Sequence, residues 1–438
     1  MVSNNSTATI RLAVDYRDFA SLCLSDEVEF MVIGAVEGPS ARRSMGTVIL
    51  VGPVKNAPRG CVTLGPAMKC LASLVAAAVL TAAPSSHAAL LENAQPSGLK
   101  LKSLSTLTFG PEGLLILADS STATVTAIET GDTGPFQVLS QPVRDVAGTI
   151  AGGLGTDAGN ISVLDMAVNP ASGKVYLAVQ RRPDNAALIV TIDAGGNVAP
   201  LDTSKLSHAS VTLPGGSGSK VTKVTDVAFD RDRIFATGSC NEEFASRIFT
   251  IPVPVRHGAT ADVFSAETYH VAHRKWETKA PIQSFIPYDS KDGRYVVGAF
   301  ACTPVAKFRV DDLENGAKVK GVSMVELGSG NRPIDLFDYT DANGKEWLVV
   351  HTQRFKDNSF GPSKLWGARV SMDYINAAED QANENAARRD VNEKSGPEGI
   401  EIVDALFGAV QVAKLGERDM IVLRDTEGRL NLEVANLP

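Results

Sequence analysis

The sequence predicts an all-β protein, a β-propeller of six blades. A four-strand pattern recurs six times between Leu104 and Leu437, and the last copy ends one strand short. Each copy has an alternating apolar and polar strand, a turn with Asp, Asn or Gly, and a second strand rich in Val, Ile, Leu and Tyr. Spacings of about 50 to 70 residues suit four-stranded blades with long loops. The first strands of the copies begin at Ser105, Leu164, Thr225, Ile282, Ile334 and Val403.

The composition is that of a large folded domain. Of 438 residues, 44% are hydrophobic and 6% aromatic, and 38 are glycines. Strands of β-branched residues joined by many tight turns give this balance. The net charge of −8 argues against a nucleic-acid partner, because no basic excess is available to neutralise phosphates.

A secretory signal peptide is predicted at 68–88. Met68 and Lys69 precede an Ala-rich apolar run, and small residues follow as far as Ala88. This order is typical of a signal cleaved after Ala88, and the run is too short for a good membrane span. A buried helix is the alternative. We therefore expect a bacterial protein that is periplasmic or secreted, with no membrane span after signal removal.

Residues 1–67 precede the expected signal and show no repeat. Either translation starts at Met68 and 1–67 is a mis-assigned extension, or 1–67 is a genuine disordered extension that would make the signal inoperative. In both cases 89–438 is predicted to form a single propeller domain.

The last copy has predicted strands at 400–407, 420–424 and 430–434 but no fourth strand. An N-terminal strand at 98–104 would close the last blade beside 430–434 and leave no exposed edge. Seven blades is the main alternative, because weak copies are easily missed, and two sandwiches is a further one. The polar, Ala-rich segment 372–389 predicts a solvated helical insertion in the fifth blade.

Two cysteines, Cys240 and Cys302, remain after the expected signal. An even pair in an exported protein suggests a disulfide, and both cysteines end the second strand of adjacent copies. Equivalent positions of neighbouring blades approach closely enough for such a bond. Two free buried thiols are the alternative. A metal site is least favoured, because no third Cys or nearby His completes a ligand set.

Polar residues near the start of the first strands predict a ring around the central channel. The ring residues are Thr106, Asp165, Asp226, Gln283, Asp335 and Asp404. The four carboxylates cannot all stay charged there unless cations join them, and otherwise their pKa values rise. Calcium suits such oxygen ligands, so the four aspartates are candidate calcium ligands, whereas zinc would need more histidines. Alternatively, each Asp accepts hydrogen bonds from turn N–H groups or from the next blade.

A second set of candidates lies on loops at the same face. His351 is the histidine nominated as a base or ligand. Arg332 and Arg354 could offset the aspartates or bind an anionic substrate, and Glu242 is a further catalytic candidate. Equally, Arg332 could pair with Asp335 and fix its loop.

Three stretches resemble motifs of an exported bacterial β-propeller family. They are Asn-Glu-Glu-Phe-Ala-Ser at 241–246, Ala-Cys-Thr-Pro at 301–304 and Gly-Asn-Arg-Pro-Ile-Asp at 330–335. The resemblance covers about the middle third of the chain and implies the fold and export, but no reaction. More broadly, the ring resembles six-bladed calcium-dependent lactonases and soluble quinoprotein sugar dehydrogenases, and a shared fold does not fix function.

The expected function is binding of a small ligand or a protein partner at the channel mouth. The alternative is a calcium-assisted hydrolase, lactonase-like or esterase-like, with calcium on the aspartates and His351 as base. A quinone-cofactor dehydrogenase, with Arg332, Arg354 and calcium holding an anionic cofactor, is less favoured. The sequence leaves open whether the protein is an enzyme.

Overall fold

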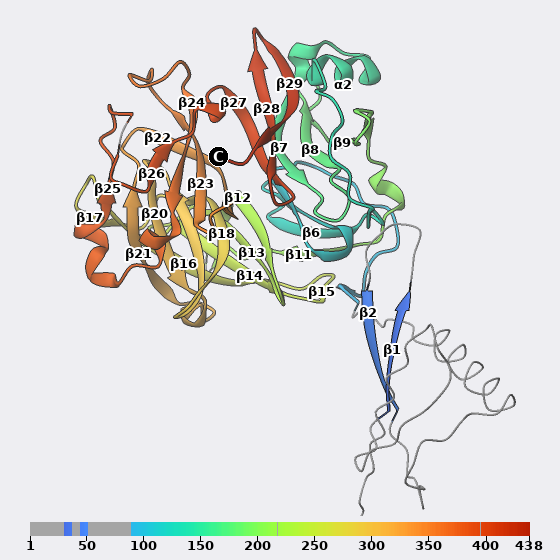
Figure 1. The fold of residues 1–438 in the computed structure, drawn as a ribbon, viewed down its shortest axis with the longest axis horizontal. Coiled ribbons are helices and arrows are strands. Elements are labelled where there is room, and N and C mark those ends of the chain that lie inside the picture. The colour runs from blue at the N-terminus through green and yellow to red at the C-terminus, as the bar shows by residue number, and fades with distance from the viewer. Residues whose placement is uncertain (1–29, 37–43, 51–88, 217, 395) are drawn as a thin grey trace, which may run out of the picture. The chain divides into compact units, whose positions relative to one another are not determined.

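The computed structural model describes residues 30–36, 44–50, 89–216, 218–394 and 396–438 (Figure 1). The chain divides into two compact units, Met1–His87 and Ala88–Pro438. In the first unit, β1 (Phe30–Val36) pairs antiparallel with β2 (Ser44–Leu50). The expected signal peptide at 68–88 lies outside the described residues.

The described part of the chain contains no helix that is long and apolar enough to cross a membrane.

The second unit is mostly β, with a propeller-like arrangement of small sheets. One sheet contains β4 (Thr106–Phe109), β5 (Leu114–Asp119), β6 (Thr124–Glu129) and β11 (His208–Thr212). The next contains β7 (Ile161–Val168), β8 (Val175–Arg181), β9 (Ala186–Ile192) and β10 (Val198–Pro200). Helix α2 (Val146–Leu154) precedes β7 in the chain.

Two further sets of four strands are joined into one larger sheet. The first set is β12 (Val221–Asp230), β13 (Arg233–Cys240), β14 (Ser246–Pro252) and β16 (Asp262–His270). The second set is β18 (Ile282–Ser290), β19 (Gly293–Phe300), β20 (Pro304–Arg309) and β21 (Lys318–Glu326). The outermost strands β16 and β21 pair in parallel and join the two sets.

The remaining strands form two sheets and several short additions. One sheet is β22 (Asn331–Thr340), β23 (Glu346–Arg354), β24 (Leu365–Ser371) and β26 (Ile400–Ile402). The other is β27 (Ala409–Leu415), β28 (Asp419–Thr426) and β29 (Arg429–Asn436). The short strands are β3 (Leu91–Glu92), paired with β15 (Val255–Arg256), then β17 (Lys275–Glu277) on β16 and β25 (Ala387–Arg388) on β21.

The second strand of each sheet carries much of the core. β5 is buried along its whole length, and Val296 and Val297 of β19 and Ile421 and Val422 of β28 are fully buried. These strands lie between two others, and their side chains pack against neighbouring sheets on both faces. A strand that is buried on both faces has a continuous run of apolar residues in its sequence, and these strands have such runs.

The six innermost strands close a circle, but not in chain order. β4 lies beside β7 and β12, β12 beside β18, β18 beside β22, β22 beside β27, and β27 beside β7. The β4 sheet therefore lies between the β7 sheet, which follows it in the chain, and the β12 sheet. After the β7 sheet, β11 returns to pair with β6. A hydrogen bond of 2.8 Å between the hydroxyls of Thr126 and Ser210 links these two strands.

The predicted closing strand is wrong. Residues 98–104 form no strand, and the N–H of Gly98 donates to the Ser204 carbonyl at 2.7 Å instead. The edge of β29 is met by Val143, whose N–H donates to the carbonyl of Leu432 at 2.9 Å. The apolar residues of 98–104, including Leu99, pack against the core around β4 and β8, which fixes this segment elsewhere.

The segment expected as a solvated helix has a different structure. Residues 372–389 contain α3 (Met372–Ile375), the 3-10 turns Glu379–Gln381 and Asn383–Asn385, and β25. Met372 and Ile375 are each 1% exposed and belong to the core around β23 and β24. Burial of these side chains outweighs the helix propensity of the polar residues around them.

The predicted disulfide is not formed, and Cys240 and Cys302 are free thiols. Cys240 lies beside Arg247, and burial raises the pKa of its thiol. Cys302 accepts the N–H of Gly330 at 3.5 Å and lies beside His270, which lowers the pKa of its thiol. The two cysteines are not at equivalent positions in the structure, because Cys240 is the last residue of β13, whereas Cys302 lies in the turn after β19 has ended at Phe300.

Candidate functional site

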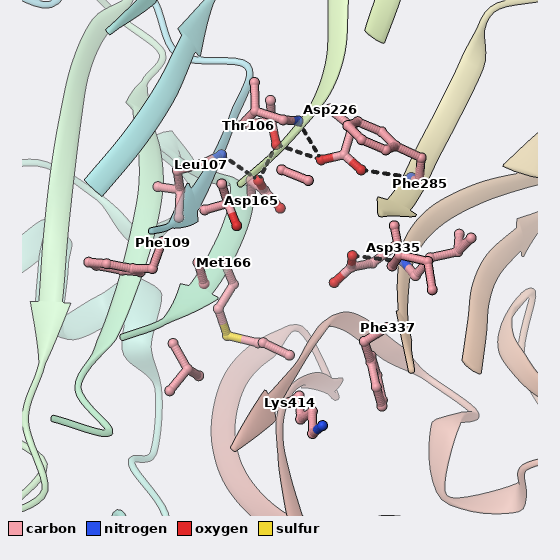
Figure 2. Close-up of a pocket in the computed structure, with 18 of the residues that line it drawn as sticks. Thr106, Leu107, Phe109, Asp165, Met166, Asp226, Phe285, Asp335, Phe337 and Lys414 are labelled. Atoms are coloured by element: carbon pink, nitrogen blue, oxygen red, sulfur yellow. Dashed lines mark hydrogen bonds between the residues drawn. The ribbon is translucent and has the colours of Figure 1, made fainter. Parts of the chain in front are cut away.

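A cavity of about 640 Å³ lies within the circle of innermost strands. Every one of these strands contributes residues to its lining, and Figure 2 shows Asp165, Asp226 and Asp335 around the same space. A cavity of this size is in the range that holds small molecules.

A β-bulge positions the polar residue of nearly every innermost strand. The strand pairing shifts register immediately before the polar residue in five strands, and Thr106 opens the remaining strand, β4. The residues that follow the five shifts are Asp165, Asp226, Ser284, Asp335 and Gln411. A bulge turns one side chain out of the regular alternation, so these residues occupy one structural position.

Acidic and neutral side chains alternate at this position around the circle. In spatial order the residues are Asp165, Thr106, Asp226, Ser284, Asp335 and Gln411. Chain order would place Asp165 next to Asp226. The exchanged places of the β4 and β7 sheets insert Thr106 between them, so each carboxylate is followed by a residue that can donate a hydrogen bond.

Each oxygen of the Asp226 carboxylate accepts two hydrogen bonds. Its Oδ2 accepts the Ser284 hydroxyl at 2.8 Å and the Phe285 N–H at 2.9 Å, both from the next sheet. Its Oδ1 accepts the Val227 N–H at 2.8 Å and the Thr106 hydroxyl at 3.3 Å. The carboxylate thereby connects three innermost strands, β12, β18 and β4, as in the structural alternative of the sequence analysis.

Asp165 makes the same contact with the next sheet. Its Oδ2 accepts the Thr106 hydroxyl at 2.7 Å and the Leu107 N–H at 2.8 Å. We refer to Asp165 and Asp226 as the clamped aspartates. Each uses one oxygen for a hydroxyl and an adjacent backbone N–H of the neighbouring innermost strand.

Asp335 and Gln411, which we call the open pair, break this pattern. Asp335 Oδ1 accepts the N–H of Leu336 at 2.8 Å, and no described residue donates a hydrogen bond to its Oδ2. Gln411 turns its amide nitrogen to the Leu164 carbonyl at 3.1 Å. Its Oε1 is buried and has no partner among the described residues. The open pair therefore presents two unused oxygen acceptors.

The three carboxylates are half-buried, and their surroundings disfavour charge. Burial raises the pKa of Asp165 to about 6. Burial, with repulsion from Asp165, raises the pKa of Asp226 to about 7. Burial and repulsion from both clamped aspartates raise the pKa of Asp335 well above its usual range. The group therefore holds protons near neutral pH unless a cation replaces them.

Beyond the ring, the cavity lining mixes apolar side chains with charged ones, and the charged residues are Asp230, Asp338, Lys414 and Glu417. Phe109, Phe229 and Phe337 contribute to its lining, together with Met166. Lys414 lies well away from the three carboxylates in Figure 2 and interacts electrostatically with Asp338. The cavity thus has an acidic ring, and its further lining contains both aromatic and charged side chains.

Two predicted ring positions are wrong. Asp404 is exposed in a 3-10 turn, where Lys394 lies 2.7 Å from its Oδ1, because the innermost strand of its sheet begins later, at Ala409. Gln411 of β27 occupies the ring position predicted for Asp404. Residues 400–402 form β26, the outer strand of the preceding sheet, beside β24. Gln283 turns to the Pro281 carbonyl at 3.2 Å, and the following residue, Ser284, occupies the ring.

The four catalytic candidates do not line the cavity. His351 is fully buried, its Nε2 lies 2.9 Å from the Ala409 carbonyl, and burial lowers the pKa of its imidazole to about 4. Arg332 is exposed and donates to Gln353 at 3.1 Å, not to Asp335. The two others are held elsewhere, since Glu242 pairs with Arg247 and Arg354 donates to the Val391 carbonyl at 3.0 Å.

Sequence reasoning missed Ser284 because a bulge shifts the register by one residue, and it missed Gln411 because the innermost strand of the last sheet begins later than predicted, at Ala409. Each nonetheless has a signal in its own strand. Ser284 directly precedes the apolar Phe285, as Thr106 precedes Leu107, and Gln411 is a lone amide between Val410 and Val412.

No family model matches the chain, and no curated protein matches it. Solved structures are only distantly similar. The exo-1,5-α-L-arabinanase from a bovine ruminal metagenomic library is 11% identical, with 63% of this chain and 93% of that chain covered and a TM-score of 0.31. The PQQ-bound aldose sugar dehydrogenase of Streptomyces coelicolor is 13% identical, with 78% and 97% covered and a TM-score of 0.23.

The GH43 protein BlXynB of Bacillus licheniformis is 10% identical, with 78% of this chain covered and a TM-score of 0.32. The chain spans about half the length of BlXynB and of the Bacteroides ovatus GH43B, 53% and 52% respectively. Similarity of this degree identifies no activity for this chain.

Proposed function

We propose that the second unit is a six-bladed propeller that binds a small positively charged ligand in its central cavity. Support for six blades comes from the closed circle of innermost strands, each of which begins one small sheet. The two sheets joined through β16 and β21 count as separate blades, because each has its own innermost strand. In the last blade, Val143 takes the fourth place beside β29.

The observation that carries the binding proposal is the open pair. No described residue donates to Oδ2 of Asp335 or to the buried Oε1 of Gln411, whereas Oδ2 of each clamped aspartate accepts hydrogen bonds from the next strand. The buried Oε1 of Gln411, an acceptor without a partner among the described residues, costs about 1–3 kcal/mol. A ligand with N–H donors or a positive charge would recover this cost and favour the charged form of the carboxylates.

An organic cation suits the acidic ring and the aromatic part of the lining. Its charged end would lie against Asp335, and its apolar body against Phe109 and Phe337. Aromatic faces attract cations as well as apolar groups. The clamped aspartates would add negative potential without changing their hydrogen bonds.

Calcium is the second candidate, favoured by the two unused oxygens beside the clamped carboxylates. Calcium takes 6–8 oxygen ligands, so several waters would complete such a site. Hydrolysis on that calcium has less support, because none of the described histidines lines the cavity and His351 is buried elsewhere. The quinone-cofactor alternative also loses support, since neither Arg332 nor Arg354 reaches the cavity lining.

Export to the periplasm or outside the cell is proposed on the sequence of 68–88 alone. A protein partner at the channel mouth likewise remains a proposal, with no described surface that identifies it.

The test is a thermal-shift screen of the full chain against calcium chloride and a panel of alkylammonium compounds. We expect one class to raise the melting temperature of the wild type but not of Asp335→Asn. Asp404→Asn is the matched control, because it makes the same change at an exposed aspartate paired with Lys394. Equal stabilisation of Asp335→Asn and wild type by every compound would contradict the proposal.

A further inference from the structure

A second cluster of ligand-type side chains lies outside the central cavity. His270 ends β16, Glu277 ends β17, and His273 lies in the turn between these strands. Nδ1 of His270 lies 2.9 Å from Glu277 Oε2, and Nδ1 of His273 lies 2.8 Å from Oε1. The two imidazole rings are 4.0 Å apart between centroids. The carboxylate thus faces both imidazoles at once.

The hairpin register explains why these residues meet. His270 pairs with Lys275 and Thr268 pairs with Glu277, so His270 and Glu277 project from the same face of the two strands. Tyr269 and Trp276 occupy the opposite face and contact each other edge to face at 5.7 Å. The turn then folds back, with the His273 N–H donating to the His270 carbonyl at 3.1 Å.

The geometry is that of a three-ligand metal site. One ligand atom from each of His270, His273 and Glu277 can be chosen so that all three lie within 4.8 Å of one another. Tetrahedral bonds of about 2.0–2.2 Å to zinc place ligand atoms about 3.3–3.6 Å apart, so the three side chains would draw slightly closer on binding. Two imidazoles and one carboxylate form a ligand set that first-row transition metals accept, and calcium does not prefer it.

The surroundings of His270 supply a second observation. His270 is 3% exposed and lies beside the Cys302 thiol, and its Nε2 has no hydrogen-bond partner of ordinary geometry among the described residues. Glu326 is fully buried beside it, with Oε2 accepting the Ala272 N–H at 2.9 Å and Oε1 without a partner. Metal-binding histidines commonly donate their second N–H to a carboxylate, which fixes the other nitrogen as the ligand.

We propose that His270, His273 and Glu277 bind a divalent first-row transition metal, with zinc the best fit, and that water takes the fourth position. The site is accessible, because the His273 side chain is 46% exposed. Lys275 lies 3.5 Å from Glu277 Oε1 and must move aside, which its 64% exposed side chain permits. Bound zinc would stabilise β17, a three-residue strand whose one partner among the described strands is β16.

The test is a calorimetric zinc titration of the full chain after removal of metals with a chelator. We expect one zinc per chain at this site, with affinity falling at least tenfold in Glu277→Gln and in His273→Gln. Zinc should also raise the melting temperature of the wild type and not that of the two variants. His273 is half-exposed, so its replacement should leave the metal-free fold unchanged.

Two controls separate this site from other zinc binding. His257→Gln removes a histidine whose Nδ1 accepts the Ser210 N–H at 3.2 Å, and it should bind zinc like the wild type. Asp335→Asn changes the central cavity and should also leave zinc affinity unchanged. The proposal is overturned if the wild type binds no stoichiometric zinc, or if folded Glu277→Gln and His273→Gln bind it with unchanged affinity.

Discussion

The clamped aspartates and the open pair occupy equivalent positions of one ring yet differ in their donors. Asp226 receives four hydrogen bonds, including the Ser284 hydroxyl and the Phe285 N–H from the next sheet. Asp335 receives one, from the Leu336 N–H of its own strand. The number of donors depends on the residue that follows the bulge in the next innermost strand, which is Ser284 beside Asp226 and Gln411 beside Asp335. A short hydroxyl donates to the carboxylate, whereas the longer amide of Gln411 reaches past it to the Leu164 carbonyl.

This difference separates a structural role from a binding role within one ring. The clamped carboxylates are committed to holding sheets together, and a ligand would have to break those bonds to use the same oxygens. The open pair has acceptors available without such a loss. The following experiments change one side of the comparison at a time.

The largest expected effect is in Asp226→Ala. The change leaves the Ser284 hydroxyl and the Phe285 and Val227 N–H groups without their acceptor, so we expect a loss of about 3 kcal/mol in the free energy of unfolding. Relief of repulsion with Asp165 offsets only part of this loss. Urea denaturation of Asp226→Ala and Asp335→Ala makes the comparison, and equal costs for the two variants would refute the distinction.

Acid should weaken the structure that supports the open pair. His351 pairs with Asp335 in the strand register, and its Nε2 contacts the Ala409 carbonyl at the start of β27. Its pKa is about 4, below the unfolded value of 6.5, so its stabilising contribution is present above pH 6.5 and is lost as the pH falls through 4. The loss over that window is about 3 kcal/mol.

The measurement is the free energy of unfolding from pH 7 to pH 4 for wild type and His351→Gln. The variant should be less stable at pH 7 but should lose less stability on acidification. Parallel pH profiles for the two proteins would show that His351 does not carry this acid sensitivity.

Gln411→Met should reduce cation affinity by about tenfold, or about 1.4 kcal/mol, because it removes the unused Oε1 while keeping the length of the side chain. Gln411→Glu is the opposite change and should increase affinity by adding a charge. Both variants lose the donor to Leu164, so that loss is matched between them. If a titration shows that Gln411→Met binds the cation as tightly as Gln411→Glu, or more tightly, residue 411 does not provide an oxygen ligand.

The smallest effect is expected in Asp335→Asn without ligand. Asp335 has a raised pKa, so its favourable contribution is present below its unfolded pKa and is lost as the pH rises through the folded value. Removing the charge should therefore stabilise the ligand-free protein by about 1 kcal/mol at pH 8 and have little effect at pH 4. Asp404→Asn should show no such gain, because Asp404 is exposed and paired with Lys394. A gain at pH 4 that equals the gain at pH 8 would exclude charge repulsion as the cause.

Much of the architecture could be predicted from sequence. The repeated apolar strands indicated an all-β, propeller-like arrangement, and the structure confirms it at that level. Four of the six predicted ring residues, Thr106, Asp165, Asp226 and Asp335, line the cavity. These residues directly precede apolar strand residues, so their alternation was readable along the chain.

The remaining features depend on pairing between distant segments. The exchange of the β4 and β7 sheets requires β11 to return to β6, and no local pattern records that choice. The bulges that bring Ser284 and Gln411 into the ring each shift the register by one residue, which reverses the face of every side chain beyond the shift. The cluster of His270, His273 and Glu277 likewise depends on pairing, because the register of β16 with β17 brings Glu277 to the two histidines.

The most direct test of the central claim is calorimetric titration, at pH 6 and pH 8, with the cation that most stabilises the protein. The open pair predicts one site per chain, tighter binding at pH 8 because protons must leave carboxyls with raised pKa values, and at least tenfold weaker binding in Asp335→Asn. Asp404→Asn should bind like the wild type. If Asp335→Asn retains wild-type affinity at both pH values, the open pair is not a cation site and the ring is structural throughout.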